Sequence, residues 1–138
     1  RSDDESYALA IRSRCLLAMK RIPESLQIAE RALALNNRNK GLRKFLIVTI
    51  KAHQVNASQG KSPNWQEALT RIESALEEAM RRGFVDIQFE ARLASGEIEM
   101  KFGKLPGSRE RLKILEQEAQ EKGFALIAAK VDQMLRGN

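Results

Sequence analysis

The residues with the greatest chemical reactivity are few, and they stand far apart in the chain. His53 is the single histidine and Cys15 the single cysteine, and neither lies in an HExxH or CxxC pattern. A protein zinc site needs three or four such ligands, and acid–base or nucleophilic catalysis needs a reactive group held beside a second one. The sequence therefore predicts no metal site, no cofactor and no catalytic centre, and we do not expect an enzyme.

Structural roles account for these residues instead. His53 falls on the same face of a predicted helix as Phe45 and Ile50, so we expect it to pack as a structural residue. Cys15 lies in an apolar helical segment, cannot form an internal disulfide, and is expected to be a small buried hydrophobic residue. The acidic run at residues 3–5 stands where a helix is predicted to begin, and there its charge favours the helix dipole.

Basic charge is concentrated in the first half of the chain. Residues 1–61 hold 12 Lys+Arg and 5 Asp+Glu, a net charge of +7, whereas residues 62–138 hold 12 and 13, a net charge of −1. This asymmetry indicates an acidic partner or nucleic acid near the first half. It also fits an ordinary solvated basic surface.

The composition predicts an all-α protein. Ala, Leu, Glu, Lys, Arg and Gln dominate, and these residues favour helices. Period-two alternation of aromatic or β-branched residues, which is typical of strands, is absent. No apolar run approaches the ~20 residues of a membrane span, so no membrane segment is expected. The chain begins with an acidic stretch and without an initiator Met, and we expect it to be a piece of a longer protein.

A repeat of 43 and then 40 residues aligns three segments, which begin at Ile22, Trp65 and Leu105. Small residues stand three positions into each segment, and apolar residues follow at spacings of four and three. This spacing marks one face of a helix, and the small residues would let a neighbouring helix approach closely. The matching positions are Ser25, Ala68 and Ser108; then Ala29, Ile72 and Leu112; then Ala32, Ala75 and Leu115.

Glycine and proline mark the predicted helix ends. Gly41, Gly83 and Gly123 each precede a hydrophobic residue, a pattern in which glycine ends one helix before the next begins. Pro23 and Pro106 are equivalent in the repeat and suit the first turn of a helix. Capping boxes are predicted at the pairs Asn64–Glu67 and Ser2–Glu5.

These signals predict seven helices with a polar loop at residues 59–64. The fourth helix has one broad apolar stripe, which runs from Trp65 to Met80, and a solvated opposite face that carries Glu73, Glu77 and Arg81. The fifth helix is apolar on two sides, which is typical of a helix between two neighbours. The predicted ranges are 3–20, 23–37, 41–58, 64–82, 85–102, 106–122 and 124–136, the last of which would cap the stack.

The chain resembles the tetratricopeptide repeat family in the segments ESLQIAERALAL, QEALTRIESALEEA and LASGEIEMKFGKLPGSRERLKIL. Gly96 resembles the family's small helix-contact residue and Gly103 its turn residue. The spacing departs from the family's usual ~34 residues. The resemblance implies a right-handed α-α superhelix with repeats at 3–37, 41–82 and 85–122 and a capping helix at 124–136. The chain also resembles the C-terminal helical-repeat regions of large bacterial multidomain proteins.

The resemblance further implies a scaffold that binds a protein or peptide segment in a concave groove lined by the first helix of each repeat. Arg14 and Lys51 would hold a partner's carboxylate through charge-assisted hydrogen bonds. The partner could also be another domain of the same chain. The candidate groove positions are Tyr7, Arg14, Lys51, Gln54, Glu90 and Glu97.

Two other interpretations remain open. Nucleic acid could bind the basic cluster Arg38, Lys40, Arg43 and Lys44, although interleaved aromatic residues for base stacking are absent and nucleic acid is the less expected partner. Alternatively, the exposed ends of the array could stack on one another and form a homodimer.

Overall fold

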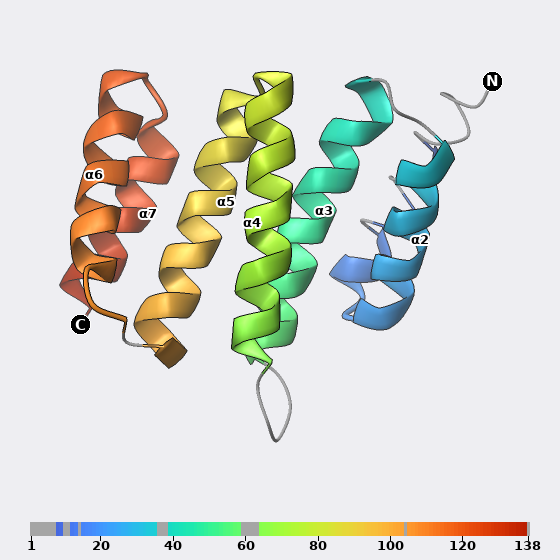
Figure 1. Cartoon of the computed structure of the whole chain (residues 1–138), viewed down its shortest axis with the longest axis horizontal. Helices are drawn as coiled ribbons and strands as arrows, with labels where there is room; N and C mark the ends of the chain where they lie inside the picture. The colour runs from blue at the N-terminus through green and yellow to red at the C-terminus, as the bar shows by residue number, and fades with distance from the viewer. Residues whose placement is uncertain are drawn as a thin grey trace. The chain divides into compact units, whose positions relative to one another are not determined.

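The computed structural model describes residues 8, 9, 12, 13, 15–35, 39–58, 64–103 and 105–137, and within these ranges every regular element is a helix (Figure 1). The predicted all-α class is confirmed. No helix among these residues is long and apolar enough to cross a membrane. The elements are α2 (Ile22–Leu35), α3 (Asn39–Ser58), α4 (Trp65–Arg82), α5 (Val85–Ile98), the short π-helix η1 (Glu99–Gly103), α6 (Ser108–Glu121) and α7 (Ala125–Arg136).

The chain divides into two compact units, Arg1–Pro63 and Asn64–Asn138. In the first unit α2 packs against α3, and a helical segment at residues 15–18 precedes α2. Ser13 and Ser25 are both fully buried and bond reciprocally, because the Ser13 hydroxyl donates to the Ser25 carbonyl at 2.5 Å and the Ser25 hydroxyl donates to the Ser13 carbonyl at 2.7 Å. Ser25, predicted as a small contact residue, thus closes onto the preceding segment.

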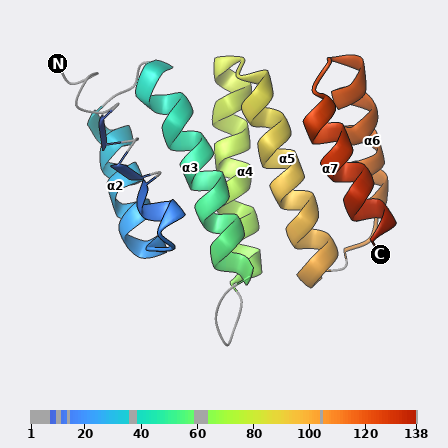
Figure 2. The same ribbon diagram turned by 180° about the vertical axis from the view of Figure 1, so that it is seen from behind.

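The second unit consists of two helical hairpins, α4 with α5 and α6 with α7, and α5 also packs against α6. Within this unit α4 and α6 lie toward the viewer in Figure 1, whereas α5 and α7 lie toward the viewer in Figure 2. The predicted division of the chain into repeats at 3–37, 41–82 and 85–122 stays a prediction.

Burial repeats along α4 and α6 at the predicted offset of 40 residues. The inward positions of both helices are at most 4% exposed, which confirms the predicted burial of this face. Ser25 and Ala29 of α2 are buried in the same way. The matched pairs are Ala68 and Ser108, Ile72 and Leu112, Ala75 and Leu115, and Ala79 and Ala119.

The same hydrogen-bonded turn closes both hairpins. Gly83 and Gly123 have φ of 70° and 81°, values that a side chain with a Cβ atom rarely adopts. The next residue's N–H donates back to the carbonyl five residues earlier, from Phe84 to Ala79 at 2.9 Å and from Phe124 to Ala119 at 2.8 Å. This Schellman arrangement satisfies carbonyls that the helix end would leave unpaired, and it confirms both glycines as helix ends.

Lys20 ends the segment before α2 with the same turn. Its φ is 60°, its N–H donates to the Leu17 carbonyl at 2.9 Å, and the Arg21 N–H donates to the Leu16 carbonyl at 2.9 Å. The prediction that Gly41 ends a helix was wrong, because Gly41 lies in the first turn of α3, which begins at Asn39.

Two further start signals were wrong. Asn64 precedes α4, but its side chain makes no capping hydrogen bond. Pro106 lies before α6, in a turn that the Ser108 N–H closes on the Leu105 carbonyl at 3.2 Å. Gly107 has φ of 81° and ψ of −1°, the values of the third residue of a type II turn. Pro23 lies in the first turn of α2 as predicted, and the pair Ser2–Glu5 falls outside the described residues.

Two side chains and one helix end differ from the predictions. Cys15 is exposed rather than buried. Met80 is 60% exposed, although it belongs to the apolar stripe predicted for α4. The helix predicted to run to residue 102 is α-helical only to Ile98 and continues as η1, which contains Gly103. A Cβ atom on Gly103 would lie 3.1 Å from the Trp65 ring, so η1 packs closely against the start of α4.

The two apolar faces of α5 are confirmed. One face buries Ile87, Ala91 and Ile98, and the other buries Phe89 and Leu93 in a cluster with α6 and α7. The Phe89 ring meets the Phe124 ring edge-on, with centroids 4.9 Å apart. The positions of α7 that match Phe89, Leu93 and Gly96 of α5 at the 40-residue offset are Ala129, Gln133 and Arg136, all exposed. Therefore α7 keeps only one apolar face.

Candidate functional site

A groove of about 650 Å³ lies in the second unit. Helices α4 and α6 both pack against α5, but they do not pack against each other in the described part of the chain. The space between them is open to solvent, with α5 as its floor. Its lining consists of Leu69, Glu73, Leu76, Met80, Gln88, Arg92, Ser95, Gly96, Glu99, Leu105, Ser108, Arg111, Leu112 and Leu115.

The wall from α4 is a single stripe of the helix surface. Leu69, Glu73, Leu76 and Met80 follow one another at spacings of four, three and four residues, so they share one face. The two leucines are half-buried, and Glu73 is exposed. Glu73 is exposed as predicted, but its side chain lines the groove between two leucines and does not lie opposite the apolar stripe.

A polar corner fixes the start of the α6 wall. The Ser108 hydroxyl lies within donating distance of the Leu105 carbonyl, at 2.8 Å, and of Glu99 Oε2, at 3.0 Å. Arg111 forms an ion pair with the same Glu99 carboxylate, whose side chain is only 13% exposed. Both charges of this corner are therefore satisfied within the protein.

Arg92 on the groove floor is held in the same way. Its Nη1 lies 2.5 Å from Glu118 Oε2, and its guanidinium lies 5.8 Å from the centroid of the Phe89 ring, within the range of a cation–π contact. Among the charged residues that line the groove, Glu73 has no ion-pair partner in the described part of the chain.

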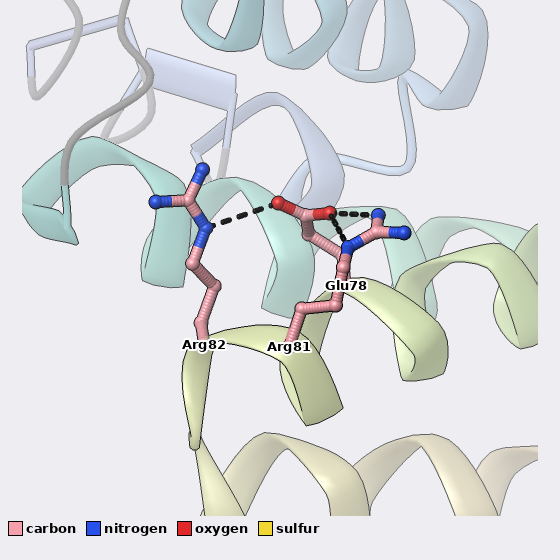
Figure 3. Close-up of polar contacts among 3 residues, drawn as sticks. All are labelled: Glu78, Arg81 and Arg82. Carbon is pink, nitrogen blue, oxygen red and sulfur yellow. Dashed lines mark hydrogen bonds and ion pairs between the residues drawn. The ribbon is translucent and has the colours of Figure 1, made fainter.

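The last turn of α4 carries a separate charge cluster, which does not line the groove (Figure 3). The Glu78 carboxylate accepts hydrogen bonds from Arg81 Nε and Arg82 Nε, each at 3.1 Å. The bond from Arg81, followed by the bond from Arg82, lowers the pKa of Glu78, although burial opposes the shift. The same contact with Glu78 raises the pKa of Arg81. Arginines at this helix end also favour the dipole.

Four of the six predicted groove positions, Lys51, Gln54, Glu90 and Glu97, fall among the described residues. Tyr7 and Arg14 lie outside the described residues. Lys51 is exposed and lines a small hollow of about 190 Å³ in the first unit, with Leu17, Ala18, Ile47 and Val48. Gln54, like His53, is half-buried on α3. Glu90 and Glu97 are half-buried on α5, and neither belongs to the lining of the larger groove.

Sequence reasoning missed Glu73, Arg92 and Arg111 as groove residues. For Glu73 a signal was present, because it is four residues after Leu69 and three before Leu76, which is the spacing of one helix face. No comparable signal marks Arg92 and Arg111, whose positions depend on how α5 and α6 pack. Comparison with protein-family models, curated proteins and solved structures finds no match to this chain.

Proposed function

We propose that the chain is a non-catalytic, tetratricopeptide-like interaction module that binds a segment of a partner protein in the groove between α4 and α6. The repeat relation between the two hairpins supports the family resemblance and, with it, a right-handed superhelical arrangement of the repeats. The observation that carries the binding role is the groove itself, a concave surface of about 650 Å³, within the size range of protein ligand sites.

Its chemistry suits a peptide. Two of the more exposed large hydrophobic side chains of the chain lie on its rim, Met80 at 60% and Leu105 at 40% exposure. Exposed apolar side chains around a concave surface are typical of protein contact sites. Arg92 on the floor and the Glu99–Arg111 pair and Ser108 hydroxyl of the corner already bond within the protein, so a partner would gain chiefly from apolar contact and from the remaining charge of the wall.

The test is selection of a phage-displayed random peptide library on the full chain, followed by affinity measurement of the enriched peptides. We expect the double variant Met80→Gln/Leu105→Gln to bind these peptides at least tenfold more weakly, since full burial of a Leu or Met side chain contributes about 1.5–3 kcal/mol and a tenfold change in affinity is about 1.4 kcal/mol.

The matched control is the double variant Ile114→Gln/Leu126→Gln. These side chains are 51% and 68% exposed in the same unit but do not line the groove, so the peptides should bind this variant as they bind the parent. A library that yields no binders, or binders equally weakened by both double variants, would contradict the proposed function.

A further inference from the structure

We propose that the groove selects a partner segment with a lysine or arginine between apolar side chains, and that this cation pairs with Glu73. The inference rests on the proposed function of the groove and adds the chemical class of the partner. It follows from the distribution of charge over the groove lining.

The two cations of the lining are already neutralised. Arg111 is paired with Glu99 and lies 3.3 Å from the Ser108 hydroxyl, and Arg92 is paired with Glu118 at 2.5 Å. An acidic partner would meet guanidinium groups whose positive charge a carboxylate of the protein already offsets. An acidic segment therefore gains little from this groove.

Glu73 offers the opposite case. It is the lining charge without an ion-pair partner in the described part of the chain, so a partner's cation would meet no competitor. The same carboxylate would repel acidic partners, which increases the selectivity of the groove for basic over acidic segments.

The neighbours of Glu73 set the pattern around the cation. Leu69 and Leu76 lie about one helical turn to either side of it, and Met80 lies one turn further. Leu112 and Leu115 face the same space from α6. A bound cation would thus be flanked by apolar surface on both sides, which calls for apolar side chains before and after the lysine or arginine.

The test repeats the phage-displayed random library on the full chain, on Glu73→Lys and on Asp132→Lys. Asp132 lies on α7, outside the groove, and its pair with Arg136 is exposed, so this control makes the same change of net charge elsewhere. We expect the parent and Asp132→Lys to enrich peptides with a basic residue between apolar ones. Glu73→Lys should bind those peptides roughly tenfold more weakly and should itself enrich acidic residues at that place.

The outcomes separate this inference from the proposed function. If Glu73→Lys binds the enriched peptides as well as the parent does, while Met80→Gln/Leu105→Gln loses them, the groove binds peptides but the choice of a basic partner is wrong. If no peptide is enriched, or if Met80→Gln/Leu105→Gln binds the enriched peptides as tightly as the parent does, both proposals fail. A shared melting temperature among the variants confirms that all are folded.

Discussion

Gly96 is a point of close approach between α5 and α6. A Cβ atom placed there would collide with the Leu112 side chain and lie 3.0 Å from its Cγ, and Leu112 is 1% exposed. Overpacking of a core contact costs about 1–3 kcal/mol, whereas alanine gains about 1 kcal/mol of helix propensity over glycine. We expect Gly96→Ala to lower the free energy of unfolding by about 1 kcal/mol, measured by urea denaturation.

The neighbouring substitution Ser95→Ala is the control, because Ser95 lines the open groove rather than the contact with α6. It should change the free energy of unfolding by less than about 0.5 kcal/mol. Equal or greater stability of Gly96→Ala would show that α6 does not pack on α5 at this residue.

Glu78 gives a prediction about pH. Its pKa lies below the ordinary value of 4.5, chiefly because Arg81 donates a hydrogen bond to it. A lowered pKa in the folded state stabilises the protein at pH values above 4.5, and this contribution is lost as the pH falls through the folded-state pKa. Glu78→Gln should therefore melt a few degrees below the parent at pH 7 and together with it at the acid end of the titration.

Glu73→Gln is the matched control for this measurement, since it removes a carboxylate of the same helix that has no ion-pair partner among the described residues. Its melting temperature should follow that of the parent at neutral pH. A difference between Glu78→Gln and the parent that persists unchanged into acid would contradict the assigned role of the carboxylate.

The helix ends provide a prediction for the elements. Gly83 has φ of 70°, and a Cβ atom there would meet nothing within 4 Å, so only the backbone conformation opposes a side chain. Gly83→Ala should lower the free energy of unfolding by about 1 kcal/mol. Lys20 already carries this strain at φ of 60°, so Lys20→Gly should leave stability unchanged or slightly raised. Thermal denaturation of both variants tests these two expectations. Destabilisation by Lys20→Gly would contradict the left-handed conformation assigned to Lys20.

Helices and their inward faces were readable from the sequence because helix-forming residues and small–apolar spacing act locally. The predicted glycine turns at Gly83 and Gly123 are confirmed, and at both the helix ends in a Schellman turn. Gly41 was misassigned because a glycine before a leucine fits a first helical turn as well as a helix end. The π-helix after Ile98 has no local signal in the sequence, and in the structure its last residue, Gly103, lies against the Trp65 ring.

The groove was harder to predict, because it lies between two helices that do not pack against each other in the described part of the chain. Sequence spacing placed Leu69 and Leu76 on an apolar stripe, but it could not show that part of this stripe faces open space rather than α6. No sequence signal indicated that Glu99 would pair with Arg111 and Ser108. These residues meet only because the turn at Gly107 brings α6 back beside η1. The candidate positions derived from the family resemblance therefore missed this groove.

The division into two units makes a prediction for the molecule as a whole. The cluster around Phe89, Leu112 and Val131 lies entirely within residues 64–138. We expect this segment, produced alone, to keep its helical circular dichroism and to unfold in one cooperative transition. A segment that is unfolded without residues 1–63 would show that its core is incomplete.

The proposed binding of a partner segment in the groove between α4 and α6 can be tested directly by NMR. The most direct measurement is the change in backbone amide chemical shifts of the ¹⁵N-labelled full chain as a library-selected peptide is added. We expect the changes to concentrate on residues 69–80 and 105–115 and to leave residues 15–58 unchanged. Changes centred on the first unit, or on the exposed face of α7, would contradict it.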